Sequence, residues 1–175
     1  MVPPQVSKSY NKSSTFAKVL DKSKIIAIVG PTATGKTDLA LMLAKKFNGE
    51  IISADSRTIY RGLNIGTAKP TGRWTTAIFD GSKKEKFFIY KRIPHHLIDF
   101  LSPKKTFSAA DFARLAKKSV KKIQGRGKIP IICGGTGFWI ETLLNPSLLP
   151  DVPPNIQLRR QLEKNTVSQL FSQLK

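Results

Sequence analysis

The chain has 175 residues, 40% of them hydrophobic, which is enough for one domain with a hydrophobic core. Lys and Arg number 30 against 11 Asp and Glu, a formal net charge of +19, and an excess of this size favours polyanionic partners, nucleic acid first among them. The sequence contains no apolar run long enough to span a membrane, so no membrane partner is expected, and its single cysteine, Cys133, excludes an internal disulfide.

Residues 1–22 are rich in Lys and Ser and include one acidic residue, Asp21. A transit peptide would carry Arg, which this stretch lacks, so we expect a basic, disordered tail. No apolar stretch stands ahead of a small-residue cleavage site, so a secretory signal is not indicated. Cys133 follows two isoleucines at a predicted strand end and is expected to be a buried structural thiol. A lone thiol fits a reducing compartment, and we predict a cytoplasmic protein.

A strand, a glycine-rich turn and a helix then follow in register. Residues 25–29 form an apolar, β-branched run typical of a buried parallel strand. Leu39, Leu43 and Phe47 recur every four residues, with Ala40 and Ala44 beside them, and predict the apolar face of a helix. The turn between them has the full G-x-x-x-x-G-K-[ST] pattern of a phosphate loop (P-loop), made of Gly30, Pro31, Thr32, Ala33, Thr34, Gly35, Lys36 and Thr37.

Such a turn aims backbone N–H groups and the positive end of the helix dipole at an anion. Lys36 is expected to neutralise a di- or triphosphate, and the Thr37 hydroxyl is expected to hold Mg2+. The alternative is a glycine-rich turn that binds nothing, and the register of strand, loop, Lys-Thr pair and helix argues against it. We therefore predict a polyphosphate-binding site.

Polar residues also follow two later strands. Residues 50–55 predict a second strand, which leads into Asp55, Ser56, Arg57 and Thr58. Asp55 has three interpretations at this position: a Mg2+ ligand, a general base or a helix N-cap. A strand over 129–133 leads into Gly134-Gly135-Thr136-Gly137, ahead of a helix over 138–144. That turn either lets its amides approach a charged group or simply joins a strand tightly to a helix.

Between these clusters lies a variable stretch, residues 70–93, with many Lys and the aromatic residues Trp74, Phe87, Phe88 and Tyr90. Aromatic rings among lysines can stack on bases, and a β-hairpin packed on the domain explains them equally well. Residues 95–99 predict a third strand, in which His95 and His96 point to opposite faces and cannot chelate one metal together. We expect one of them to be buried and hydrogen-bonded, and the other to face the site or solvent.

A capping pair, Ser108 and Asp111, predicts the start of a helix that Gly125 and Gly127 end. Its apolar face comprises Phe112, Leu115, Ala116, Val120 and Ile123, and its polar face carries Lys117, Lys118, Lys121 and Lys122. A second basic cluster comprises Lys83, Lys84, Lys86, Lys91 and Arg92. A charge run is usually a solvated face, but repeated positive charge beside a phosphate loop favours RNA or DNA.

The alternation of strands and helices predicts an α/β fold, a parallel sheet flanked by helices with its sites at the carboxyl ends of the strands. Four strands are predicted, whereas such sheets normally carry about five or more, so we expect a fragment. A proline-containing break separates a core, residues 23–150, from residues 151–175, which we predict to be helical.

The ordered motifs resemble the tRNA dimethylallyltransferase (tRNA isopentenyltransferase) family in its N-terminal portion. The resemblance rests on the phosphate loop and on residues 53–57, 59–70, 94–99, 107–112 and 134–137, and it runs from about residue 25 to residue 150. It implies a P-loop NTPase-like fold, with residues 151–175 as the truncated beginning of a helical insertion. It also implies transfer of a dimethylallyl group from dimethylallyl diphosphate to N6 of an adenine beside the tRNA anticodon.

In that family the phosphate loop holds the donor diphosphate, with Mg2+ as the expected cofactor. By resemblance, Asp55 is the general base and Thr136 lies near the reacting centre, while Asp55, Ser56, Arg57 and Thr58 contact the anticodon stem-loop of the tRNA. Arg159 matches a tRNA contact of the helical insertion. Thr58 departs from the family, which usually has Gln there, and residues 71–93 are longer than the usual connection.

Three alternatives follow from the same residues. A P-loop small-molecule kinase shares the polyphosphate site, a relative acting on free adenine nucleotide shares the donor site, and an inactive RNA-binding fragment would retain only the basic surface. The charge of +19 argues against the free nucleotide. Oligomeric state has no signal in the sequence, and we expect a monomer.

Overall fold

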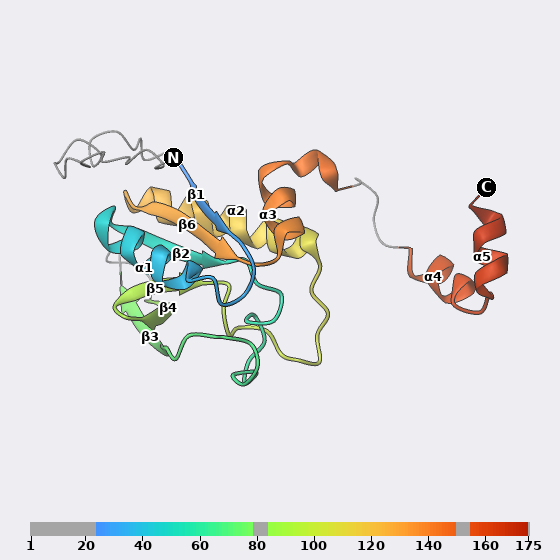
Figure 1. The fold of residues 1–175 in the computed structure, drawn as a ribbon, viewed down its shortest axis with the longest axis horizontal. Coiled ribbons are helices and arrows are strands. Elements are labelled where there is room, and N and C mark those ends of the chain that lie inside the picture. Colours follow the sequence, from blue (N-terminus) through green and yellow to red (C-terminus); the bar gives the residue numbers. More distant parts are fainter. Residues whose placement is uncertain (1–23, 79–83, 150–154, 175) are drawn as a thin grey trace, which may run out of the picture.

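A computed structural model of the protein describes residues 24–78, 84–149 and 155–174 (Figure 1). The expected basic tail, Lys83 of the second basic cluster and residues 150–154 of the proline-containing break lie outside these ranges. The described part is built around one mixed sheet with helices on both faces.

The sheet has six strands in the order β1-β6-β2-β5-β4-β3. Four of them run parallel and correspond to the predicted strands: β1 (Ile26–Val29), β6 (Ile129–Gly134), β2 (Gly49–Ser53) and β5 (Ile93–His96). The predicted third strand, over 95–99, was wrong in its bounds, because β5 begins two residues earlier and the chain bends after His96.

The other two strands correct the predicted count of four. β3 (Arg73–Ile78) and β4 (Lys84–Tyr90) form an antiparallel hairpin that extends the sheet beyond β5. The hairpin interpretation of the aromatic residues is confirmed, since Phe87 and Phe88 are buried on β4 and Trp74 packs edge-on against Phe88. A six-stranded sheet removes the strand count as an argument for a fragment.

Helix α1 (Lys36–Lys46) covers one face of the sheet, and its predicted apolar face is confirmed except at Leu39. Ala40, Leu41 and Ala44 pack against Ile28, Ile51 and Ile131, whereas Leu39 is 43% exposed. Leu43 and Phe47 are partly buried against the same cluster, and the small side chains of Ala40 and Ala44 let the helix approach the sheet closely.

Helices α2 (Ala109–Gly125) and α3 (Gly137–Leu144) cover the opposite face. Phe112 of α2 stacks on Trp139 of α3 with ring centroids 4.8 Å apart, and both lie over Ile52 and Ile132 of the sheet. The capping pair is confirmed, because the Ser108 hydroxyl accepts from the Asp111 amide and the Asp111 carboxylate accepts from the Ser108 amide. The predicted lysine face of α2 is exposed as expected.

Beyond α3, a short 3-10 turn, η2 (Pro146–Leu148), leads to two short helices, α4 (Ile156–Leu162) and α5 (Val167–Gln173). The helical prediction for residues 151–175 holds in the described part, with a break at which Thr166 caps α5. Figure 1 shows α4 and α5 apart from the sheet. Among the described residues, no helix has the length and apolar character needed to cross a membrane.

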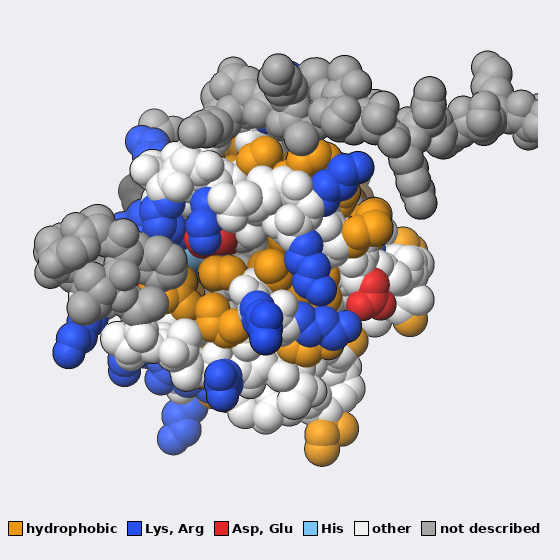
Figure 2. All heavy atoms as spheres, turned by 90° about the vertical axis from the view of Figure 1, so that its left-hand side faces the viewer, with side chains coloured by type: hydrophobic (Ala, Val, Ile, Leu, Met, Phe, Trp, Pro, Cys, Tyr) orange, Lys and Arg blue, Asp and Glu red, His pale blue; other side chains and the backbone are white. Residues whose placement is uncertain are grey.

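Positive side chains are spread widely over the surface. Figure 2 looks at the end of the molecule where β2 and β6 begin and α2 ends, and it shows Lys and Arg scattered among hydrophobic and other side chains, with few Asp or Glu.

Candidate active site

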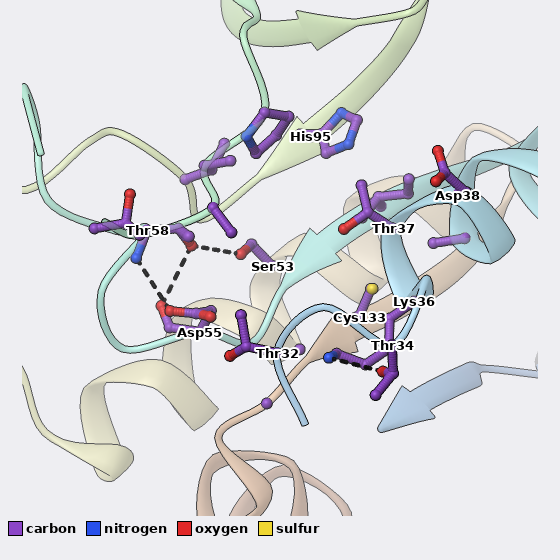
Figure 3. A pocket seen from close by; sticks show the side chains of 18 of the residues that line it. Thr32, Thr34, Lys36, Thr37, Asp38, Ser53, Asp55, Thr58, His95 and Cys133 are labelled. Atoms are coloured by element: carbon purple, nitrogen blue, oxygen red, sulfur yellow. Dashed lines mark hydrogen bonds between the residues drawn. The ribbon is translucent and has the colours of Figure 1, made fainter. Parts of the chain in front are cut away.

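The carboxyl ends of β1, β2 and β6 meet at one edge of the sheet, because the three strands are parallel neighbours. The three polar clusters predicted from the sequence therefore lie together there, around a cavity of about 380 Å³ (Figure 3). The cavity is lined by residues 32–38 of the phosphate loop and α1, by Ser53, Asp55, Thr58, Thr67, Ala68 and Pro70, and by Ala40, Ile51, His95, Ile98, Cys133, Gly134 and Gly135.

The phosphate loop leaves its amides available for an anion. Gly35 precedes α1 with φ of 78°, a left-handed conformation in which glycine is unstrained, and no side chain caps the helix. The first N–H groups of α1 therefore point into the cavity without a side-chain acceptor. Lys36 folds back over the loop, where its Nζ donates to the Pro31 carbonyl oxygen and lies 3.4 Å from Thr34 Oγ1.

The glycine-rich turn after β6 has a packing role at its first position. A Cβ atom on Gly134 would lie 2.0 Å from the carbonyl oxygen of Ala54, because the two strand ends are hydrogen-bonded to each other here. The Ala54 amide donates to Cys133 and the Thr136 amide donates back to Ala54. Of the two interpretations of this turn, the structure supports tight joining for Gly134, while Gly137 has open space around it.

Asp55 lies half-exposed beside this turn, held by backbone amides. Its Oδ1 accepts from the N–H of Arg57 at 2.8 Å and from that of Thr58 at 3.2 Å. It therefore caps a turn, and the helix N-cap interpretation is wrong because no helix follows. No protein group among the described residues hydrogen-bonds Oδ2, so the carboxylate is oriented by one oxygen and free at the other.

Thr136 is joined to the same turn across the sheet edge. Its Oγ1 accepts from the Ser56 amide at 3.0 Å, which places the hydroxyl directly beside the residues that follow β2. Ser56 and Arg57 are exposed, and with Thr136, Gly135 and Thr67 they line a second hollow of about 340 Å³ that shares Asp55 with the main cavity. Asp55 thus stands between two open spaces.

Two of the residues predicted to contact tRNA, Thr58 and Arg159, do not line the second hollow. Thr58 is only 5% exposed, and its Oγ1 is 2.9 Å from Ser53 Oγ, so it forms part of the cavity wall (Figure 3). Arg159 is exposed on α4 and lines neither hollow.

The loop that supplies Thr67, Ala68 and Pro70 is fixed by a buried ion pair that the sequence did not reveal. The Lys69 side chain is 3% exposed, and its Nζ donates to Asp99 Oδ1 at 2.7 Å and to the Tyr60 carbonyl. Partial burial acts to raise the pKa of Asp99, but hydrogen bonds from Lys69 and Trp74 outweigh it and lower that pKa. The pair holds one wall of the cavity in place.

His95 forms another part of the cavity wall. It is buried and hydrogen-bonded, as expected of one histidine, and it also faces the site, as expected of the other. Its ring is 5% exposed, Nδ1 lies 2.9 Å from the Ile93 carbonyl oxygen, and Nε2 has no hydrogen-bond partner among the described residues. Burial lowers the pKa of His95 to about 4, so the ring is neutral near pH 7 and Nε2 is an acceptor. His96 points to the other face, where its Nε2 contacts Glu50 at 2.7 Å.

Cys133 is only half-buried, which corrects the prediction of a buried thiol, and its sulfur faces the cavity. Burial is the main cause that raises its pKa to about 11, with Lys36 acting to lower it and Asp55 to raise it. The thiol is therefore protonated near neutral pH and is a poor nucleophile.

Fold and site together define a phosphate-loop α/β protein in which an anion-binding turn and a partly free carboxylate share one cavity. Family models agree in detail: the model described as "IPP transferase" matches residues 58–175, and the model described as "Isopentenyl transferase" matches residues 23–92. The chain belongs to the IPP transferase family.

Several relatives cover most of the chain. A tRNA dimethylallyltransferase of Anoxybacillus flavithermus is 41% identical over 152 residues, which are 87% of this chain and 44% of that relative. One of Chloroflexus aggregans is 46% identical over 142 residues, 81% of this chain and 43% of that relative. The chain spans less than half the length of these relatives.

Solved structures give the same result. The full-length tRNA isopentenylpyrophosphate transferase of Bacillus halodurans matches with a TM-score of 0.60 and 37% identity over 87% of this chain and 46% of that one. A eukaryotic dimethylallyltransferase, captured acting on tRNA, matches with a TM-score of 0.55 and 30% identity over 83% of this chain and 31% of that one.

Proposed function

We propose that the chain transfers a dimethylallyl group from dimethylallyl diphosphate to N6 of an adenine next to the anticodon of a tRNA. One observation carries the proposal: Asp55, with one carboxylate oxygen free, lines the same cavity as the phosphate loop. Membership of the IPP transferase family and the names of the relatives support it.

In the proposed reaction the donor diphosphate lies against the phosphate loop, where the amides at the start of α1 and the Lys36 ammonium group meet its charge. The N6 lone pair attacks the first carbon of the dimethylallyl group, and the bond from that carbon to the diphosphate oxygen breaks. The electron pair of that bond leaves with the diphosphate, and Asp55 accepts the proton that N6 loses. Thr136, hydrogen-bonded beside Asp55, would face the same reacting centre.

The residues present fit a bound Mg2+ ion of the kind that phosphate loops hold. Thr37 offers a hydroxyl in the first turn of α1, and the described residues contain no cluster of three His, Cys, Asp or Glu that would form an all-protein metal site. Mg2+ usually takes few protein ligands and keeps waters and phosphate oxygens, so Thr37 with the diphosphate would suffice. When bound, the ion would neutralise charge on the leaving diphosphate.

The acceptor base would enter from the second hollow. Ser56 and Arg57 are exposed at its rim, and an adenine reaching Asp55 from there must leave its stack in the anticodon loop. Thr58 would affect tRNA binding indirectly, by forming part of the cavity wall, since its side chain is buried. Arg159 on α4 would contact the tRNA away from the reacting base.

Mass spectrometry of an anticodon stem-loop tests the proposal, after incubation with the full chain, Mg2+ and dimethylallyl diphosphate. We expect one dimethylallyl group on the target adenine. Asp55→Asn should reduce transfer about 10²- to 10⁴-fold while donor binding persists, because the amide oxygen can still accept from Arg57 and Thr58. Glu141→Gln, an exposed change on α3, is the matched control and should leave transfer unaltered.

Two results would contradict the proposal. Undiminished transfer by Asp55→Asn would remove the assigned base. Failure to bind dimethylallyl diphosphate, together with ATP-dependent phosphorylation of a small molecule, would establish the kinase alternative instead.

A further inference from the structure

The outward face of α2 carries an uninterrupted row of positive side chains. Arg114, Lys117, Lys118, Lys121 and Lys122 are all exposed and together line a surface hollow of about 490 Å³. We refer to these five residues as the α2 basic face. No acidic or apolar side chain takes part in its lining.

This arrangement is unfavourable for the helix by itself. Lys117 and Lys121 are four residues apart, as are Lys118 and Lys122, so like charges face each other at the spacings where charges interact most strongly on a helix. Proximity to the negative end of the helix dipole offsets this only for Lys122 in the last turn. An anion lying along the face would remove the repulsion.

Few acidic groups neutralise the face from within the protein. Arg114 contacts Asp111 at 3.2 Å, and Lys122 contacts Glu85 on β4. Lys117, Lys118 and Lys121 form no ion pair with any residue that the structure describes. Three adjacent cations of the row are therefore available to an external partner.

The opposite side of α2 is already committed to the core. Phe112, Ala116 and Ile123 are fully buried against the sheet and α3. An amphipathic helix inserts into a bilayer through its apolar face, and here that face has no access to lipid. The α2 basic face can therefore make only electrostatic and hydrogen-bonding contacts, which are the contacts a phosphodiester backbone offers.

The location of the face separates it from the cavity. The helix connects the end of β5 with the start of β6, so it begins at the edge of the sheet that holds Asp55 and runs toward the opposite edge. Lys117 and Lys121 lie roughly 14 to 20 Å along the axis from the N-cap Ser108, at 1.5 Å per residue. Figure 2 shows Lys and Arg continuing over the end of the molecule that α2 reaches.

We propose that the α2 basic face binds the phosphate backbone of the substrate RNA at a distance from the reacting base. The inference rests on the proposed function for the identity of that RNA as a tRNA, and on the charge, exposure and position of the face for the contact itself. It assigns to α2 a positioning role: it holds the RNA body while the target base occupies the hollow beside Asp55.

The test measures equilibrium binding of a tRNA transcript to the full chain over a series of salt concentrations. The variant is Lys117→Gln/Lys121→Gln, which keeps good helix formers at both sites and relieves a like-charge pair. The matched control is Lys45→Gln/Lys46→Gln, which removes two exposed positive charges from the end of α1 on the other face of the sheet.

Loss of two phosphate contacts should lower the slope of log affinity against log salt by about 1.4 to 1.8. Equivalently, the affinity deficit of the α2 variant relative to the wild type should shrink about tenfold between 50 and 200 mM salt. The control should keep the wild-type slope. Thermal unfolding of the α2 variant should match or exceed that of the wild type, which excludes misfolding as the cause. The control should unfold at a slightly lower temperature, because it removes two cations from the last turn of α1.

Three outcomes would overturn the inference: equal slopes for wild type and α2 variant, equal losses in variant and control, or α2-dependent binding of phosphatidylserine vesicles without α2-dependent binding of tRNA. The proposed function is tested separately by transfer to the short stem-loop. Transfer without α2-dependent binding rejects only this inference, and α2-dependent binding without transfer rejects only the proposed reaction.

Discussion

Replacing Glu50 by Gln should destabilise the protein far more than an ordinary surface change. Glu50 lies in β2 with no exposed surface, and its carboxylate is surrounded by the cationic groups of Arg126 and Lys128 and by the ring of His96. His96 Nε2 and Arg126 Nη2 each lie 2.7 Å from Oε2, and Lys128 Nζ lies 2.9 Å from Oε1. The amide of Gln would leave the nearly buried Arg126 and Lys128 cations without this counter-charge, at a cost of about 3 to 5 kcal/mol.

The pKa of Glu50 gives an independent value for the same interaction. Burial acts to raise this pKa, but the hydrogen bonds from His96, Arg126 and Lys128 outweigh it and lower the pKa from 4.5 to about 2. Such a shift corresponds to about 3 kcal/mol of stability that is present above pH 4.5. Because the unfolded chain takes up the proton first as pH falls, this contribution is lost from pH 4.5 downward to pH 2, and about 2 kcal/mol of it disappears between pH 5 and pH 3.

Urea unfolding of wild type and Glu50→Gln at pH 7, 5 and 3 measures both quantities. The difference in unfolding free energy should be about 3 kcal/mol or more at pH 7 and should narrow by about 2 kcal/mol between pH 5 and pH 3. Glu85→Gln is the control: its carboxylate is one-third exposed, and the change should cost less than about 1 kcal/mol. A difference that stays constant with pH would refute the ion network as the source of the stability.

Three further measurements test the turn after β6, the cap of α2 and the thiol of Cys133. In chemical denaturation, Gly134→Ala should lower the unfolding free energy by about 2 kcal/mol or more, because its Cβ would meet the Ala54 carbonyl. Gly137→Ala has open space for its Cβ and should be neutral or stabilising by up to about 1 kcal/mol. Ser108→Ala should cost about 1 kcal/mol and Ser108→Thr little, since only the first loses the cap of α2. Cys133 should react with iodoacetamide at pH 8 about a thousandfold more slowly than a fully ionised thiol, with a rate that rises toward pH 11; a plateau below pH 9 would contradict the raised pKa.

The parts of the fold that the sequence predicted are those with local signals. The phosphate loop, the capping box of α2 and the positions of the four parallel strands along the chain each depend on residues close together in the sequence. The exposure of Leu39 on α1 could not be predicted in this way. A four-residue period fits several rows of one helix, and the preference for Ala40 and Ala44 over Leu39 arises from how closely the helix approaches the sheet.

The sequence predicted that the candidate site residues would meet at one edge of the sheet, but it missed the contacts that support them. Gly30–Thr37, Asp55 and Thr136 do converge on one sheet edge, as parallel strand ends require. The Lys69–Asp99 ion pair and the orientation of His95 join segments distant in sequence, and no local pattern encodes which of two adjacent histidines turns inward. The motif segments that contain these residues, 59–70 and 94–99, were the available signal, but they carry no information on which residues pair.

Strand β2 shows how the protein separates stability from chemistry. Near its start, Glu50 is completely buried and paired with Arg126 and Lys128, and it also contacts His96, so its carboxylate joins β2 to β5 and to the connection between α2 and β6. Just past its end, Asp55 is held through one oxygen by two backbone amides and is half-exposed at the cavity. Amides orient a carboxylate without supplying a counter-ion, so Asp55 keeps an oxygen free to accept a proton. Five residues apart in sequence, one acid is held by charged side chains, and the other is oriented by amide dipoles, as the base of the proposed reaction requires.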